Sequence, residues 1–83
     1  MRYTVVWEKP AETQFLRIWM RATDRQEVSD ASDRIEHDLA TDPDTKGTPH
    51  GIFHQYRDDP LAVLFHIDPG DCMVRIFQVR RTR

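Results

Sequence analysis

Histidine and arginine side chains in the second half of the sequence have the chemistry needed to act on a phosphate. His66 lies in one apolar run, and Arg75 and Arg81 lie in the next. A histidine can transfer a proton near neutral pH, and arginines can hold a phosphate and stabilise the charge that develops on it. We therefore predict His66, Arg75 and Arg81 as candidate catalytic residues. The alternative is that His66 is a half-buried strand residue and Arg75 a solvated or partner-facing one.

The charges are unevenly distributed along the chain. The whole sequence has 12 Lys and Arg against 14 Asp and Glu, which gives a net charge of −2 and argues against a strongly basic nucleic-acid binder. Residues 1–45 contain six basic and ten acidic side chains, whereas residues 46–83 contain six basic and four acidic ones. The cluster of Arg80, Arg81 and Arg83 ends the basic half. It could contact phosphate, or it could be an ordinary charged terminus.

Metal and thiol chemistry have weaker support. His50 and His54 are four residues apart, but in a strand this spacing spans about 13 Å, and the sequence offers no third ligand. Cys72 is the single cysteine, so it cannot form an internal disulfide, and we expect it to be a small buried hydrophobic residue. We therefore expect no metal and no cofactor.

The length and composition predict one small domain that spans residues 1–83. The chain has 83 residues, of which 39% are hydrophobic, and this leaves room for one modest core. The apolar run at the N-terminus is too short for a signal peptide, and no stretch is long enough to cross a bilayer. We expect a cytoplasmic protein without a membrane segment.

The elements follow from periodicity and turn signals. Residues 2–7 predict a strand, and Pro10 in a first turn opens a helix with one apolar stripe. Asp24 with Glu27 is a capping-box pattern that opens a second amphipathic helix, which Asp42-Pro43 ends before a polar loop. The period then changes to two, which predicts three antiparallel strands at 51–57, 61–67 and 72–80. The fold class is α+β: a strand, a helical hairpin and a three-stranded meander, with the helices on one face of the sheet.

The predicted register sorts the strand residues onto two faces. The turn at residues 68–71, with a positive φ at Gly70, places Ile67 opposite Cys72, Phe65 opposite Val74 and Val63 opposite Ile76, on the face that receives the helices. A turn at Asp58-Asp59 places His54 and Tyr56 on that face too; a bulge would exchange these sets. The opposite, open face then carries Phe53, Gln55, Arg57, Ala62, Leu64, His66, Met73, Arg75, Phe77, Val79 and Arg81. Apolar residues on an open face favour a partner, for which Leu64, Met73 and Phe77 are the predicted contacts.

This arrangement resembles the RelE/ParE toxin superfamily of bacterial type II toxin–antitoxin modules. The matching residues are Gly47-x-Pro49, Tyr56-Arg57, the strand of residues 61–68, and Val74-x-Ile76-x-x-Val79-Arg80-Arg81. The resemblance covers essentially the whole chain. It implies a cytoplasmic toxin neutralised by a cognate antitoxin, with messenger-RNA cleavage on the ribosome as one family activity and inhibition of DNA gyrase as the other. Under the nuclease activity, Arg57, Arg80 and Arg83 are the predicted RNA-binding residues.

The sequence departs from the nuclease pattern at several positions. Phe53 and Gln55 stand where the resemblance implies lysines, Ala62 stands where it implies an arginine, and the C-terminal segment that carries a tyrosine is not present. The resemblance therefore predicts the fold and the antitoxin better than it predicts catalysis. A non-catalytic interaction module of the same fold and a gyrase inhibitor remain as alternatives, because neither needs the nuclease residues.

Overall fold

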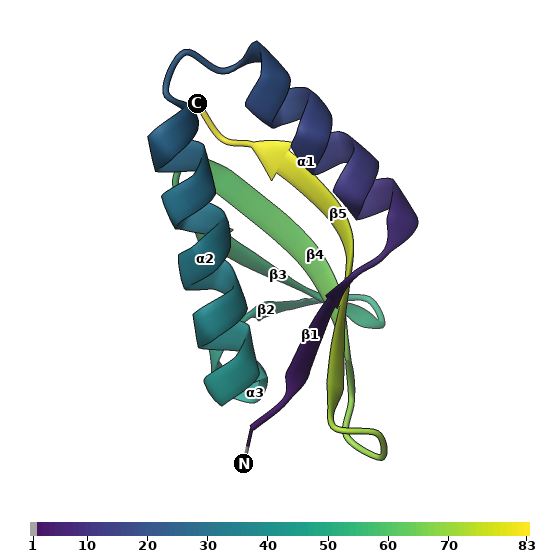
Figure 1. Cartoon of the computed structure of the whole chain (residues 1–83). Coiled ribbons are helices and arrows are strands. Elements are labelled where there is room, and N and C mark those ends of the chain that lie inside the picture. Colours follow the sequence, from purple (N-terminus) through teal and green to yellow (C-terminus); the bar gives the residue numbers. More distant parts are fainter. Residues whose placement is uncertain (1) are drawn as a thin grey trace.

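The computed structural model describes residues 2–83, which form two long helices against one sheet. The helices α1 and α2 lie on the same face of the sheet (Figure 1). No described helix covers the other face, which we call the open face. The elements in chain order are β1 (Thr4–Trp7), α1 (Lys9–Arg21), α2 (Arg25–Thr41), α3 (Pro43–Lys46), β2 (Thr48–His50), β3 (Phe53–Asp58), β4 (Leu61–Asp68) and β5 (Met73–Arg81).

The two amphipathic helices form as predicted. The apolar stripe of α1 packs on the sheet, with Ala11 fully buried, and Pro10 lies in the first turn, where its missing N–H costs no hydrogen bond. The α2 stripe of Val28, Ala31, Ile35 and Leu39 is fully buried. These side chains meet the inward-facing residues of the central strands, and the core cluster is Ala11, Val28, Ala31, Ile35, Leu39, Leu61, Val63, Phe65, Val74, Ile76 and Val79.

The predicted capping box at the start of α2 is wrong, although the helix starts where expected. Asp24 is the N-cap residue, but its side chain makes no cap hydrogen bond. Its carboxylate instead accepts a hydrogen bond from Arg81, which lies 57 residues away in sequence. A charged partner with a well-placed guanidinium competes successfully with the local backbone N–H groups.

The strands form one five-stranded sheet in the order β1-β5-β4-β3-β2. The N-terminal strand β1 pairs in parallel with β5, while the other neighbours are antiparallel. The predicted loop after α2 is only partly correct, because its first residues form the helical turn α3 and residues 48–50 form the edge strand β2. Pro49 is compatible with β2 because an edge strand leaves one row of N–H groups unpaired. No helix within residues 2–83 is long and apolar enough to cross a membrane.

The predicted register of β4 and β5 is wrong by two residues near the turn. Ile67 pairs with Val74, and Phe65 pairs with Ile76, because the loop occupies residues 69–72 and the positive φ of 52° falls at Cys72 and not at Gly70. The shift is even, so the predicted face of these residues is correct. The register between β3 and β4 differs in the same way, with Asp58 opposite Leu61, and again the faces are as predicted.

A bulge in β5 changes the faces beyond this point. Phe65 pairs with Ile76, but the next residue, Leu64, pairs with Gln78, so Phe77 is the extra residue. Val79 is consequently buried in the core, and its prediction as an open-face residue is wrong. The same bulge sends Arg80 to the open face and Arg81 to the helix face. This exchange of two consecutive arginines decides which of them belongs to the candidate site.

Candidate functional site: a basic hollow on the open sheet face

The open face gathers aromatic, amide and basic side chains from four strands. Phe53 and Gln55 of β3 lie on it as predicted, and their partners His50 and Thr48 of β2 share the face because residues directly opposite project to the same side. His54 lies on the helix face, where its ring stacks on Phe65 with 5.5 Å between centroids.

Tyr56 also lies on the helix face and donates a hydrogen bond of 2.6 Å to Asp38 of α2. Burial and this bond to a carboxylate raise the pKa of Tyr56 to about 12. The predicted division of β3 between the two faces is therefore confirmed.

His66 takes part in an aromatic cluster on the open face. The ring of Phe53 lies edge-on to both His66 and Phe77, with centroid distances of 6.3 and 5.4 Å. Arg75 is the direct cross-strand partner of His66, so two of the three predicted catalytic residues are neighbours. Arg75 is not a free cation, because its Nη1 atom donates a hydrogen bond of 3.0 Å to Glu8.

A hollow of about 370 Å³ opens beside this cluster. Its polar lining consists of His50, Gln55, Gln78 and Arg80, together with Gln14 from α1, and no carboxylate is among its lining residues. Ala62 lies between Arg80 and Arg57 across the strands, and it is buried at 2% exposure. Within residues 2–83, Arg80 makes no ion pair, so its charge is available to a ligand.

Arg81 does not lie with His66 and Arg75, so the predicted grouping of these three residues is wrong. Because of the bulge, Arg81 points to the helices, where its Nη2 atom donates a hydrogen bond of 2.6 Å to Asp24. This bond lowers the pKa of Asp24 below its ordinary value. Arg81 also donates to the backbone carbonyl of Arg83. These contacts give Arg81 a structural position between β5 and the start of α2.

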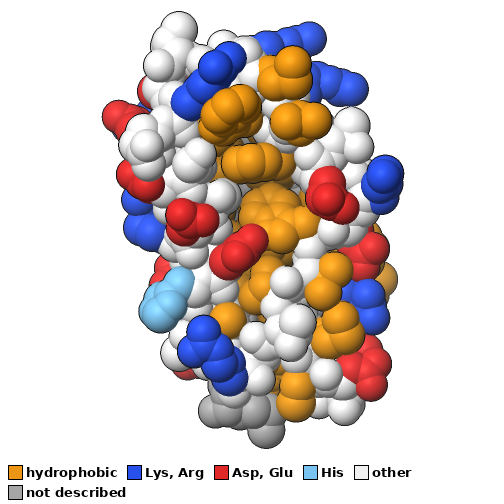
Figure 2. All heavy atoms as spheres, viewed as in Figure 1, with side chains coloured by type: hydrophobic (Ala, Val, Ile, Leu, Met, Phe, Trp, Pro, Cys, Tyr) orange, Lys and Arg blue, Asp and Glu red, His pale blue; other side chains and the backbone are white. Residues whose placement is uncertain are grey.

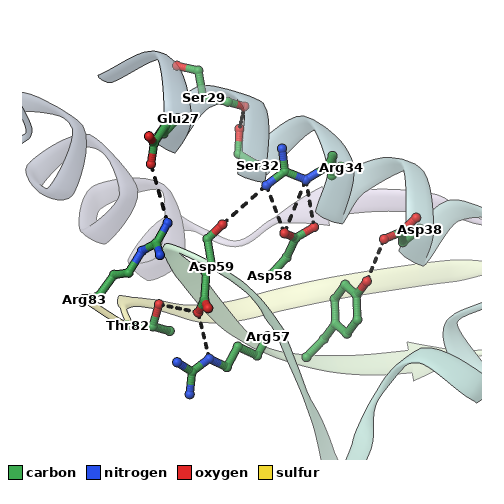
Figure 3. Close-up of polar contacts among 11 residues, drawn as sticks. Glu27, Ser29, Ser32, Arg34, Asp38, Arg57, Asp58, Asp59, Thr82 and Arg83 are labelled. Carbon is green, nitrogen blue, oxygen red and sulfur yellow. Dashed lines mark hydrogen bonds and ion pairs between the residues drawn. The ribbon is translucent and has the colours of Figure 1, made fainter. Parts of the chain in front are cut away.

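The two other predicted RNA-binding arginines are paired with carboxylates near the β3–β4 turn and the C-terminus (Figure 3). Arg57 lies on the open face and donates to Asp59 at 2.7 Å, while Arg83 forms an ion pair of 3.6 Å with Glu27. In the same network, Arg34 of α2 donates to both carboxylate oxygens of Asp58. Arg57 and Arg83 are therefore partly neutralised, in contrast to Arg80.

Apolar surface occurs on both sides of the molecule. The predicted antitoxin contacts Leu64, Met73 and Phe77 all lie on the open face, where they are half-buried. More exposed apolar side chains lie on α1, where Leu16 is 55% and Met20 61% exposed. A cavity of about 460 Å³, lined in part by Trp7, Phe15 and Leu16, lies between the two helices. Figure 2 shows the hydrophobic side chains there as a continuous stripe.

Nothing in the described part of the chain resembles a metal centre. No group of three His, Cys, Asp or Glu side chains within residues 2–83 is placed to hold a metal ion. His50 and His54 project to opposite faces, because the chain turns at Gly51, where φ is +66°. Cys72 is half-buried, and its thiol donates to the carbonyl of Pro69 at 3.8 Å.

His50, Gln78 and Gln14 of α1 are the polar lining residues of the hollow that sequence reasoning missed. The sequence places His50 next to a loop, and only the pairing of His50 with Phe53 turns it to the open face. Gln78 faces the hollow because of the bulge in β5, which has no signature in the local sequence. The position of Gln78 opposite Leu64 could have been inferred only from the pairing of β4 with β5.

Solved structures show where this fold occurs. No family model and no curated protein sequence matches the chain. A chain of the toxin–antitoxin complex RelBE2 from Mycobacterium tuberculosis is similar with a TM-score of 0.82 and 20% identity, over 98% of this chain and 99% of that one. A chain of the chromosomal ParDE toxin–antitoxin system from P. aeruginosa is similar with a TM-score of 0.68 and 11% identity, over 99% of this chain and 98% of that one. TrmO from Pseudomonas aeruginosa is similar with a TM-score of 0.64 and 26% identity, over 95% of this chain and 35% of the TrmO chain.

The strand, helical hairpin and antiparallel strands predicted from the sequence are thus shared with toxin–antitoxin proteins over nearly their whole length. Identities of 11% and 20% establish the architecture and not the chemistry. The resemblance stated from the sequence is confirmed at this level. The chain has the fold of the RelE/ParE toxins of type II toxin–antitoxin systems.

Proposed function

We propose that the chain is the cytoplasmic toxin component of a type II toxin–antitoxin module and that its open face binds messenger RNA on the ribosome. The observation that carries this proposal is the hollow beside Arg80. It has a guanidinium without an ion pair, an imidazole and three amides, and no carboxylate among its lining residues. Phosphate backbones are recognised by such arginine-containing, amide-rich surfaces.

The same surface has the groups that RNA cleavage would require. A base must take the proton of a ribose 2′-hydroxyl, whose oxygen then bonds to the adjacent phosphorus while the 5′-oxygen leaves and gains a proton. His50, which lines the hollow with Arg80, is the first candidate for these proton transfers. His66 is the second candidate, although it lies outside the lining, four residues along β4 from Ala62, the partner of Arg80. Arg80 is the candidate to stabilise the charge on the phosphate, a role for which Arg81 is turned away. Arg75 lies beside His66 as its cross-strand partner and is itself held by its hydrogen bond to Glu8.

A cognate antitoxin is the proposed protein partner. Antitoxin residues that cover Leu64, Met73 and Phe77 would also cover the hollow and so block RNA. The hydrophobic stripe between α1 and α2 is a second apolar surface that a longer antitoxin segment could cover (Figure 2). Together these surfaces give a partner apolar contacts on both sides of the sheet.

A non-catalytic interaction module is the second candidate function. Two observations favour it: Phe53, Gln55 and Ala62 replace the basic residues implied by the nuclease resemblance, and the same fold forms about a third of the longer TrmO chain. A gyrase inhibitor is the third candidate, since the ParDE system shares the fold and that activity does not need the nuclease residues.

Induced expression in a bacterial host tests the proposal. The wild-type chain should arrest growth, and Arg80→Ala should abolish the arrest while the purified variant keeps its circular dichroism spectrum. Lys9→Ala, an exposed cation at the far end of α1, is the matched control and should arrest growth like the wild type. A folded wild-type protein that is harmless would refute the toxin proposal and favour the interaction module.

A further inference from the structure

A second basic cavity lies on the helix side of β5. It has a volume of about 520 Å³ and lies between α1 and the last residues of β5. Its apolar lining consists of Ile18, Ala22 and Val79. Its basic lining comes from both elements and consists of Arg17, Arg21, Arg80 and Arg81. Asp24 is the one carboxylate among the lining residues, and Arg81 already binds it.

This cavity and the open-face hollow meet at the edge of β5. Gln14, Val79 and Arg80 line both. No strand pairs with β5 at this edge, because β1 ends at Trp7, opposite Ile76. The N–H of Val79 instead donates to the Gln14 side chain of α1 at 2.9 Å. The bulge decides which arginine faces which side, with Arg80 on the open face and Arg81 toward the helices.

The arginines of α1 extend the positive charge away from the hollow. Arg17 and Arg21 are four residues apart, so they lie on the same side of the helix. Both are exposed, and within residues 2–83 neither forms an ion pair. A path therefore runs from the hollow over Arg80 to Arg17 and Arg21, and the single carboxylate on it is neutralised by Arg81.

We propose that single-stranded RNA held in the hollow continues over the edge of β5 at Arg80 and places its next phosphates on Arg17 and Arg21. The inference rests on the proposed function of the hollow. Guanidinium groups match phosphate geometry, and the continuity of the two cavities favours one extended polyanion over a separate acidic peptide. Arg17 and Arg21 would then contribute affinity without sequence preference, because phosphate contacts carry no base information.

Binding of labelled RNA to the full chain tests this path. Two single-stranded RNAs are compared: one of about four nucleotides, which occupies the hollow alone, and one of about sixteen nucleotides. The double variant R17E/R21E should bind the longer RNA about tenfold more weakly. Its salt dependence, log Kobs against log salt, should be shallower by about 1.4, which is two contacts at about 0.7 each. Binding of the shorter RNA should be unchanged.

The control variant R2E/K9E changes the net charge by the same amount at exposed positions outside both cavities. It should bind both RNAs like the wild type. If R17E/R21E binds the longer RNA as well as R2E/K9E does, the path is refuted while RNA binding by the hollow stands. Equal weakening for both RNA lengths would also refute it, since the arginines would then act on the hollow itself. A wild-type chain that binds neither RNA would overturn the function of the hollow together with the path.

Discussion

Gly47 lies where the chain has no space for a side chain, so Gly47→Ala should destabilise the fold. An added Cβ would lie 2.7 Å from Cζ of Phe65 and 2.8 Å from Cβ of His54, both below the separation that real Cβ atoms keep. Neither neighbour can move away easily. Phe65 is fully buried in the core, and the His54 ring stacks on it at an interplanar angle of 22°.

The expected cost is that of overpacking a well-packed core, about 1–3 kcal/mol. A domain of this size has a free energy of unfolding of about 4–12 kcal/mol, so the substitution removes a substantial part of it. Each kcal/mol corresponds to a fall in Tm of about 4–8 °C. Backbone strain does not contribute, because the φ of Gly47 is −101°, which any residue can adopt.

Urea denaturation of the wild type and two alanine variants measures this cost. Gly70→Ala is the matched control, because its added Cβ would find only Asp68 Oδ1 at 3.5 Å, an ordinary contact. It should stay within about 0.5 kcal/mol of the wild type. In the G47A background, Phe65→Leu should cost less than it does alone, because the smaller side chain makes room for the new Cβ. Equal stability of G47A and G70A would refute the packing argument.

Three further predictions concern stability. Tyr56 keeps its proton to about pH 12 when folded but only to about pH 10 when unfolded, so the free energy of unfolding should fall as the pH rises between these values, and Tyr56→Phe should flatten that fall. The lowered pKa of Asp24 means that its contribution is lost as the pH falls through its folded pKa, below 3.8; Asp24→Asn should reduce this loss in acid denaturation curves, and an unaltered curve would contradict the role of the Arg81 bond. Ile35→Ala should cost about 2–5 kcal/mol in urea denaturation, whereas Leu16→Ala, at a position that is 55% exposed, should cost little.

Periodicity predicted the helices and the side of the sheet that they cover, because burial repeats at the spacing of each element. Ile35 and Leu39 on α2 and Phe65 on β4 are buried for this reason. Even errors in register left the faces of His54 and Tyr56 correct, since a shift of two residues returns each side chain to the same side.

The site residues were harder to predict, because a bulge at Phe77 decides their faces. This bulge is set by how β5 pairs with β4, and Gln14 of α1 accepts a hydrogen bond from the N–H of Val79 just beyond it. Neither partner is near in sequence, so local patterns placed Arg81 on the open face as a catalytic candidate and gave Arg80 only a role in RNA binding. The capping box at Asp24 was predicted wrongly for a related reason, since its carboxylate is used by a distant arginine.

Messenger-RNA integrity in a purified translation system tests the central claim most directly. The folded chain is added with and without ribosomes, and Arg80→Ala is compared with Arg81→Gln, a variant of the neighbouring arginine on the opposite face. The account predicts cleavage that requires ribosomes, that is lost in Arg80→Ala and that persists in Arg81→Gln once folding is confirmed. Intact messenger RNA with folded wild-type protein and ribosomes, or cleavage by Arg80→Ala at the wild-type rate, would contradict it.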